Sequence, residues 1–499
     1  MIVIVALLAT TPGPQDALIG DWIADTTETS PFTGQLEVDS QRRVARFKGE
    51  TLPLKPDGTG AWLADLPDDS AKISLRWNDG VRGLWHQKTE SGRLSWATPL
   101  NFEHPLPERW RAKVRPYRPS LPLLLRIERV SQAPNTLRVI LRDPAFNRSR
   151  FMAVTGVRKM ADHWRFERKR GDPMVGRLST DGSRLTLEVD RRRFDFRRAR
   201  QPAGLKARWT PDSTLTRPSP DADWPTRHPR EAGFDAKSLG ALVTELAEAP
   251  VRSVYDPMVH ALLVARQGQL VVEEYFFGYG PEDPHDTRSA GKSLASVLAG
   301  AVAYAQQQTP KAFGDRSLCA TATDYAELCR DPRKKQINLG HLLGMLSGLR
   351  CDDDDYESPG NEDRMQSQTE EPDWYRYAMA LPMARDPGQK AVYCTAGINL
   401  VGAMLKSLTG RPTTVLFQEL LAAPLNIEHY HHNVFDEGDG YFGGGIRLRP
   451  RDLLKFGELM RTGGRWKTQR VVSEAWVAHS IRAHGSIHTA GDYGWGWWR

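Results

Sequence analysis

The chain has 499 residues, a length at which two or more domains are expected, each able to bury a core. Hydrophobic residues make up 40% of the chain and charged residues 26%, which is typical of globular proteins. No run of 18 apolar residues occurs, so the sequence predicts no membrane-spanning helix in the mature protein.

The first eight residues form a short apolar run, which small residues and prolines follow. This pattern resembles the apolar region of a secretory signal peptide, although the usual positive charges before it are missing. The first strand of a domain would look similar, and that alternative stays open. We predict a signal peptide over residues 1–16, and therefore a periplasmic or secreted protein.

Residues 17–208 carry the pattern of β structure. Short runs that alternate in hydrophobicity or contain β-branched residues are separated by turn clusters such as Asn78-Asp79-Gly80. Long amphipathic helical patterns are absent, so we predict an all-β accessory domain, either a sandwich or a barrel. The clearest strand candidates are residues 35–38, 72–77, 137–141, 151–154 and 185–189.

Basic residues concentrate in the second half of this region. Residues 101–210 contain 27 Lys and Arg against 11 Asp and Glu, a balance of +16 in a chain whose total is +7. One interpretation is contact with an anionic polymer or membrane surface, and a solvated basic face is the other. No nucleic-acid-binding motif accompanies the charge, so we predict no nucleic-acid partner.

A polar, proline-rich stretch follows, and we place a linker at residues 209–230. After it, the pattern predicts an amphipathic helix over residues 236–247. Two strands, over residues 259–265 and 270–276, are joined by a hairpin turn. A second domain is therefore expected over residues 231–499.

The central motif of this second domain is Thr287-Arg288-Ser289-Ala290-Gly291-Lys292. It opens a segment, residues 294–304, that is apolar on nearly every face and so predicts a buried helix. Free backbone N–H groups at the start of such a helix favour negative charge. Lys292 follows Ser289 by about one turn, and its amine can activate the Ser289 hydroxyl. An ordinary capped helix is the alternative interpretation.

Two later features accompany this motif. Four consecutive aspartates, residues 352–355, follow a helix predicted over residues 337–346; they lack EF-hand spacing, so we predict a solvated loop there. Tyr393 precedes another helix. A phenol held near the Lys292 ammonium can have its pKa lowered, and can then pass protons between nucleophile and leaving group.

The four cysteines are Cys319, Cys329, Cys351 and Cys394. In an exported protein they permit two disulfides, in one of three connectivities. Four reduced thiols in a cytosolic enzyme are the alternative. No Cys-x-x-Cys or His-rich cluster accompanies them, and we predict neither a metal site nor a cofactor.

Taken in order, the motifs from about Glu231 onward resemble the serine β-lactamase and penicillin-recognising family. The resemblance is strongest to class C β-lactamases and to related secreted esterases and D-amino peptidases. The matching segments are residues 260–265 with the Gly268 hairpin, 274–276, 288–293, 342–349, 393–395, 443–445 with 450–452, and 493–498.

This resemblance implies an α/β domain in which an antiparallel sheet is flanked by helices. It implies that Ser289 is the acylated nucleophile, Lys292 its activating partner and Tyr393 the general acid and base. The substrate-binding residues that it implies are Thr395, Gly444 and Gly445.

The sequence departs from the family pattern at two places. The second motif is usually Tyr-x-Asn, and Thr395 stands at the Asn position, so a hydroxyl replaces a side-chain amide. The third motif usually follows the segment that corresponds to residues 493–498, whereas this sequence stops at Arg499. His488-Thr489-Ala490 lacks the glycine of that motif. We therefore expect a domain truncated at its C-terminus, without the strand that carries the third motif.

These observations predict a serine hydrolase that acts through a Ser289 acyl-enzyme on an ester, a β-lactam or a D-amino-acid peptide. A catalytically impaired binding protein for cell-wall or anionic ligands on the same scaffold is the alternative. Cys351 and Cys394 both flank the implied cleft, so we expect one disulfide between them. The other is then expected between Cys319 and Cys329.

Overall fold

A computed structural model shows two units of structure. One lies within residues 1–29 and 118–283, and the other within residues 30–117 and 284–499. The predicted signal peptide lies outside the described residues, and none of the helices within them combines the length and apolarity that a bilayer crossing needs. The structure describes residues 17–24, 33–58, 60–78, 80–88, 94–106, 108–115, 117, 124–130, 133–142, 154–168, 172–189, 192–199, 215, 217–249, 259–276, 279–435, 438–487 and 491–499.

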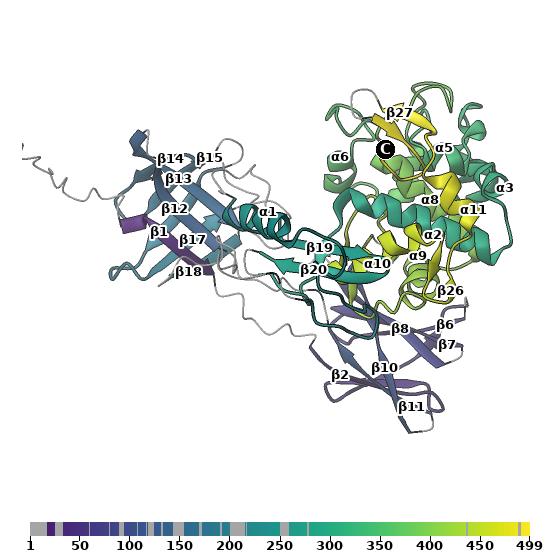
Figure 1. Cartoon of the computed structure of the whole chain (residues 1–499), viewed down its shortest axis with the longest axis horizontal. Helices are drawn as coiled ribbons and strands as arrows, with labels where there is room; N and C mark the ends of the chain where they lie inside the picture. The colour runs from purple at the N-terminus through teal and green to yellow at the C-terminus, as the bar shows by residue number, and fades with distance from the viewer. Residues whose placement is uncertain are drawn as a thin grey trace, which may run out of the picture. The chain divides into compact units, whose positions relative to one another are not determined.

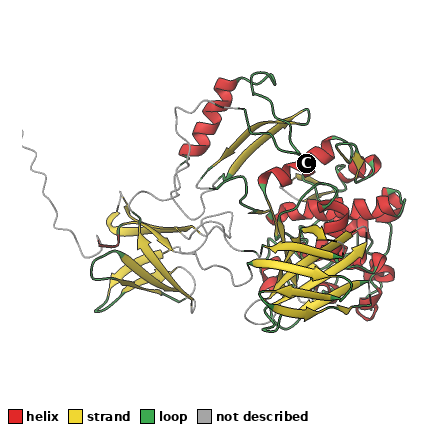
Figure 2. Ribbon diagram, turned by 90° about the horizontal axis from the view of Figure 1, so that it is seen from below, coloured by secondary structure: helices red, strands yellow, loops and turns green. Residues whose placement is uncertain are grey.

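The first unit contains an eight-stranded antiparallel sheet (Figures 1 and 2). Alternate residues of its strands point to one face, where Trp22, Trp164 and Phe166 are buried in a common core. The strand order is β13-β12-β1-β18-β17-β16-β15-β14. The strands are β1 (Gly20–Ala24), β12 (Leu124–Val130), β13 (Ala133–Arg142), β14 (Val154–Lys159), β15 (Trp164–Arg168), β16 (Met174–Leu178), β17 (Arg184–Val189) and β18 (Arg192–Arg198).

Several arginines on this sheet are paired with carboxylates. Arg177 lies 2.7 Å from Glu188, which belongs to the neighbouring strand, and Arg193 lies 3.1 Å from Asp195 on its own strand. These pairs neutralise part of the basic surface that the sequence concentrates between residues 101 and 210.

The same unit holds the first elements of the predicted second domain. Helix α1 (Ala236–Glu248) and the strands β19 (Ala261–Arg266) and β20 (Gln269–Tyr275) confirm the predicted helix and hairpin. Gln267 and Gly268 both have positive φ, 53° and 75°, as the tight hairpin turn requires. Part of the predicted linker is hydrogen-bonded to this hairpin, because Thr226 forms a parallel bridge with Leu270. Residues 209–214 and 216 of that stretch lie outside the described residues.

The second unit contains a five-stranded antiparallel sheet, ordered β10-β11-β2-β3-β4. Its buried side chains join a core that includes Leu36, Phe47 and Trp85. The strands are β2 (Gly34–Asp39), β3 (Val44–Phe47), β4 (Glu50–Pro53), β10 (Phe102–Leu106) and β11 (Arg109–Val114).

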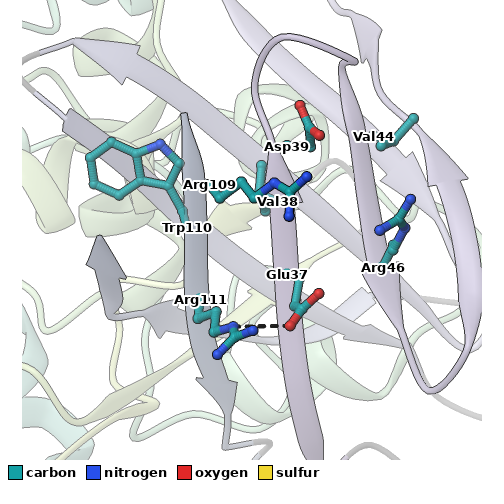
Figure 3. A pocket seen from close by; sticks show the side chains of 8 residues that line it. All are labelled: Glu37, Val38, Asp39, Val44, Arg46, Arg109, Trp110 and Arg111. Carbon is teal, nitrogen blue, oxygen red and sulfur yellow. Dashed lines mark ion pairs between the residues drawn. The ribbon is translucent and has the colours of Figure 1, made fainter. Parts of the chain in front are cut away.

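A cavity of about 280 Å³ lies on β2, β3 and β11 (Figure 3). The strand register places Glu37 between Arg111 and Arg46, and the Arg111 guanidinium lies 2.9 Å from the Glu37 carboxylate. Charges of opposite sign therefore alternate across the three strands. The cavity contains none of the predicted site residues; its lining is Glu37, Val38, Asp39, Val44, Arg46, Arg109, Trp110 and Arg111.

A nine-stranded sheet in the same unit joins distant parts of the chain. Strand β9 pairs with β22, which places Ala97 opposite His432 and Trp96 opposite Asn433. The Asn433 amide also donates to the carbonyl oxygen of Ser95 at 3.0 Å. The strands are β5 (Lys55–Pro56), β6 (Ala61–Asp65), β7 (Ala71–Asn78), β8 (Gly80–Lys88), β9 (Leu94–Leu100), β21 (His285–Asp286), β22 (Tyr430–Phe435), β23 (Asp439–Gly440) and β24 (Ile446–Leu448).

The predicted β-rich region is thus present, but its strands are divided between the two units. Strands β1 and β12–β18 belong to the first unit, whereas β2–β11 belong to the second. Strands β5–β9 extend the sheet that contains β22 and β24, so these five strands form one sheet with elements of the predicted hydrolase domain.

The two central helices of the second unit, α2 (Gly291–Ala305) and α8 (Thr395–Thr409), pack against each other (Figure 1). Both are buried along most of their length, as the apolar pattern of residues 294–304 predicts. The predicted helix over residues 337–346 is shorter, because Met345 has a φ of 60° and cannot continue it. The other helices are α3 (Pro310–Gly314), α4 (Leu318–Thr321), α5 (Leu339–Leu343), α6 (Glu362–Ser367), α7 (Trp374–Ala380), α9 (Thr413–Phe417), α10 (Pro450–Arg461) and α11 (Glu474–Ser480).

Residues 493–498 do not form one continuous strand. Strand β28 (Gly491–Tyr493) pairs with β27 (Gly485–Ile487), and the chain then turns back so that Trp498 bridges to Tyr493. Gly496, with a φ of 81°, allows this turn, because a side chain there would meet the Lys292 carbonyl oxygen at 2.8 Å. The turn places Gly496 against α2, where its carbonyl oxygen accepts the Ser293 hydroxyl at 2.6 Å, and it stacks Trp498 on Tyr393.

Candidate active site

Ser289 lies in a one-turn 3₁₀ helix, η2 (Arg288–Ala290), immediately before α2. Its side chain is exposed to solvent. Arg288 has a φ of 47°, a left-handed conformation that costs a non-glycine residue about 1–3 kcal/mol. Asp286 holds this conformation, since its carboxylate accepts the Arg288 backbone N–H at 2.9 Å and lies 3.3 Å from the guanidinium. The strained turn presents Ser289 at the start of the buried helix.

Lys292 is fully buried, with no exposed surface. Its Nζ donates to the Ser289 Oγ at 3.2 Å and to the Gly443 carbonyl oxygen at 2.8 Å. Burial lowers the pKa of Lys292, and the negative charges of Glu362 and Asp353 oppose this shift in part. A lysine whose pKa is lowered in this way has a larger neutral fraction, and neutral Lys292 can accept the Ser289 proton.

Tyr393 lies beside Lys292. The Lys292 Nζ is 4.8 Å from the centre of its ring, and Trp498 stacks on the ring at 5.4 Å. The side chains of Ser289 and Trp498 act on its hydroxyl so as to lower its pKa in part. Burial raises the pKa of Tyr393, with smaller contributions in the same direction from Asp353 and Glu362. The prediction that the Lys292 ammonium lowers the pKa of Tyr393 is therefore wrong. Tyr393 is a neutral phenol at neutral pH.

Thr395 is fully buried. The hydroxyl that replaces the usual amide hydrogen-bonds to Asp353 and not to Lys292. Its Oγ1 donates to the Asp353 carboxylate at 2.6 Å, and its backbone N–H donates to the same oxygen at 2.9 Å. The interpretation of residues 352–355 as a solvated loop is therefore wrong for Asp353. Among the described residues, no group of three or more His, Cys, Asp or Glu side chains is arranged to hold a metal ion.

A second carboxylate, Glu362, lies beside Asp353 at the start of α6. The Glu362 backbone N–H donates to the Asp353 carboxylate at 3.0 Å. The Glu362 carboxylate accepts hydrogen bonds from the Tyr441 hydroxyl and, at 3.1 Å, from the Gln366 amide. Two carboxylates therefore lie near Lys292, and neither is among the site residues that the motifs predict.

The three glycines 443–445 have different roles. Gly443 supplies the carbonyl oxygen that Lys292 binds, and sequence reasoning did not assign it to the site. The backbone of Gly444 lies against Arg288, and a Cβ there would meet the Arg288 carbonyl carbon at 3.0 Å. Gly445 faces β22, where its carbonyl oxygen accepts the Asn433 backbone N–H at 2.9 Å. The structure thus brings Gly443 and Gly444 to the nucleophile, while Gly445 ties this loop to the sheet.

Both expected disulfides are present. Cys319 pairs with Cys329, and Cys351 pairs with Cys394. The second disulfide joins the residue after Tyr393 to the segment that carries Asp353. It therefore brackets the contact between Asp353 and Thr395.

Comparison with known proteins agrees with this geometry. Residues 251–499 match the family model described as Beta-lactamase. The 6-aminohexanoate-dimer hydrolase of Paenarthrobacter ureafaciens is 25% identical over 285 residues, which cover 55% of this chain and 70% of that protein.

Two solved structures have lower similarity. EstCE1, a hydrolase with promiscuous acyltransferase activity, has a TM-score of 0.36 and 17% identity, covering 47% of this chain and 76% of that one. The octameric penicillin-binding protein homologue from Pyrococcus abyssi has a TM-score of 0.39 and 16% identity, covering 53% and 64%.

Through residues 251–499, the chain belongs to the serine β-lactamase-like superfamily. This is a family of β-lactamase-fold proteins, mostly hydrolases, with esterase, amidase and penicillin-binding relatives.

Proposed function

We propose that this protein is a serine hydrolase that cleaves small esters or amides through an acyl-enzyme on Ser289. The observation that carries the proposal is the contact of 3.2 Å between the exposed Ser289 hydroxyl and the fully buried Lys292 amine. A serine becomes nucleophilic when an adjacent base removes its proton. A lysine whose pKa is lowered by burial is such a base.

Acylation begins when neutral Lys292 accepts the Ser289 proton and Oγ attacks the carbonyl carbon of the substrate. The bond to the leaving group breaks, and the Tyr393 phenol gives its proton to the departing oxygen or nitrogen. Among the described residues, no hydrogen bond uses the backbone N–H of Ser289, so it is available to stabilise the oxyanion.

Deacylation reverses the proton transfers. The Tyr393 phenolate takes a proton from water, and the resulting hydroxide attacks the acyl carbon. The bond between that carbon and Ser289 Oγ breaks, and Oγ recovers its proton from Lys292. Each group then returns to its starting protonation state.

Among possible acyl donors, we favour esters and linear amides over β-lactams. The buried Thr395 hydroxyl donates to Asp353, so this position offers the substrate no side-chain amide. The matched relative from Paenarthrobacter ureafaciens is named a 6-aminohexanoate-dimer hydrolase, which supports an amide as the acyl donor. A peptide that ends in a D-residue is a further acyl donor to be compared.

The test is hydrolysis of short p-nitrophenyl esters by the purified chain and by Ser289→Ala. We expect Ser289→Ala to lose activity to background. Fluorophosphonate labelling of the wild-type chain should give one adduct, which peptide mass spectrometry places on Ser289. Full turnover by Ser289→Ala would refute the proposal.

The alternative, a binding protein on the same scaffold, predicts a different result. A binder would retain a ligand such as a fluorescent penicillin reversibly, without a covalent adduct and without turnover. The contact between Ser289 and Lys292 favours the enzyme, so we expect covalent labelling to be lost with Ser289→Ala.

We also propose export to the periplasm or the medium. The apolar N-terminal run supports it, and so do two disulfides, which persist in oxidising compartments. Cell fractionation with N-terminal sequencing of the mature protein tests this proposal. Recovery from the cytosol with Met1 retained would contradict it.

A further inference from the structure

Asp353 is tied to both chain segments that flank the nucleophile. Its backbone N–H donates to the Tyr393 carbonyl oxygen at 3.0 Å. One carboxylate oxygen accepts the N–H and the hydroxyl of Thr395, and the other accepts the Glu362 N–H. Three of these four hydrogen bonds fix the segment from Tyr393 to Thr395 against the loop of Asp353, and the fourth ties that loop to the start of α6. Asp354, the next residue, is exposed instead.

The titratable groups around Asp353 come from separate parts of the chain. Lys292 faces it from α2 and Glu362 from α6, and the phenols of Tyr393 and Tyr441 lie within its electrostatic influence. Burial raises the pKa of Asp353 to about 6, while the hydrogen bonds from Thr395 and the charge of Lys292 lower it. Asp353 is therefore a carboxylate at neutral pH and loses its charge in mildly acidic solution.

We propose that Asp353 is a positioning residue of this site. Held by Thr395, its carboxylate orients the Tyr393 segment and supplies the counter-charge to the Lys292 ammonium, in a site without the usual Asn amide. This inference rests on the proposed function, because it assumes that Ser289, Lys292 and Tyr393 carry out acyl transfer. It assigns the acidic run a role that its sequence does not indicate.

The direction of the effect follows from the sign of the charge. A carboxylate near Lys292 favours its ammonium form, so loss of that charge lowers the pKa of Lys292. The same carboxylate disfavours the Tyr393 phenolate, so loss of the charge also lowers the pKa of Tyr393. If neutral Lys292 and protonated Tyr393 are the active forms, both limbs of the pH profile of kcat/KM move to lower pH.

The experiment compares pH profiles of ester hydrolysis for the wild type, Asp353→Asn and Asp354→Asn. We expect Asp353→Asn to shift both limbs to lower pH by about one unit, with a loss of maximal activity. The matched Asp354→Asn removes the same charge from the adjacent exposed residue, and its profile should overlay the wild type. Asp353→Glu restores the charge and should move the profile back. Reduced activity with unmoved limbs would overturn the proposal and leave Asp353 a structural residue.

Thr395 provides a second test if Asp353→Asn folds poorly. Thr395→Val keeps the carboxylate but removes a hydrogen bond to it, so the pKa of Asp353 should rise above its value of about 6. The pH profile of Thr395→Val, scaled to its own maximum, should then depart from the scaled wild-type profile near neutrality. The scaled profile of Thr395→Ser, which keeps the hydrogen bond, should not depart from it. A Thr395→Val profile that overlays the wild type at every pH would overturn the proposal.

The two hypotheses fail in different ways. If the wild-type chain shows no hydrolysis and no fluorophosphonate adduct on Ser289, the proposed function fails. If hydrolysis and labelling are present but the limbs do not move in Asp353→Asn, the inference about Asp353 fails alone.

Discussion

The Lys292 Nζ donates a hydrogen bond to the Gly443 carbonyl oxygen at 2.8 Å, although the two residues lie 151 positions apart in the chain. This bond joins the helix that follows the nucleophile to the loop between β23 and β24. It directs one Lys292 N–H bond away from Ser289 and so fixes where the amine can receive a proton. The base is therefore oriented by a backbone atom.

Gly443→Ala should damage this orientation. A Cβ at residue 443 would lie 2.2 Å from both the Thr395 methyl group and the Tyr441 hydroxyl, so the loop must move. We expect a loss of at least about a hundredfold in kcat/KM, the usual scale of an acid–base contribution. Gly457→Ala is the control, because a Cβ at that position of α10 meets no atom within 4 Å. Equal activity in both variants would argue against a role for the contact between Lys292 and Gly443.

The pH dependence of the wild type should be bell-shaped. Burial lowers the pKa of Lys292 from its ordinary 10.5, so the acid limb of kcat/KM should report its deprotonation below that value. Burial raises the pKa of Tyr393 above 10, so the alkaline limb, where the phenol is lost, should lie above that value. Tyr393→Phe should lose at least about a hundredfold in activity and lack the alkaline limb. An alkaline limb that persists in Tyr393→Phe would show that another group causes it.

Thr395→Asn tests the substrate preference. Wild type should hydrolyse a simple p-nitrophenyl ester with a higher kcat/KM than a chromogenic cephalosporin, because Thr395 offers no amide to the lactam side chain. Thr395→Asn should shift this ratio toward the cephalosporin, and Thr395→Ser should not. Faster turnover of the cephalosporin by wild type would reverse the ranking.

The two disulfides should differ in their effect on activity. On the loop-entropy model, closing separations of 43 and 10 residues contributes about 4 and about 3 kcal/mol to the free energy of unfolding. Thermal unfolding of Cys351→Ser/Cys394→Ser and of Cys319→Ser/Cys329→Ser should show a lower Tm in each. Only the Cys351→Ser/Cys394→Ser variant should also have a lower kcat at temperatures where the protein stays folded, because Cys394 adjoins Tyr393. Similar kcat in both variants would contradict a link between the disulfide and the site.

Sequence reasoning reached the parts of this site that depend on local spacing. Ser289 and Lys292 are three residues apart on consecutive turns, so a hydrogen bond between them follows from helix geometry. Asp353 was missed because the sequence presents four aspartates in a row, with no feature that separates the one that binds Thr395 from the other three. Its role depends on a tertiary contact with Thr395, 42 residues away.

In the fold too, the features with a local sequence signal were predicted and those without one were not. The turn at Gln267 and Gly268 has a local signal, and the hairpin was predicted from it. The pairing of β9 with β22 has no local signal in the sequence, since any exposed strand edge offers the same N–H and C=O groups. The back-turned course of residues 493–498 was likewise missed, because it depends on how Gly496 packs against α2.

The pairing of β9 with β22 has a consequence for how the chain matures. Thr98 on β9 hydrogen-bonds to His431 on β22 at 2.8 Å, across a separation of 333 residues. At about 5–20 residues per second, the ribosome delivers the second strand roughly 15–70 s after the first. During that interval β9 carries an unpaired edge, the feature that most readily recruits a foreign strand. The nascent protein is therefore vulnerable to aggregation until β22 (Tyr430–Phe435) is made, and a chaperone that shields this edge should raise the yield of folded protein.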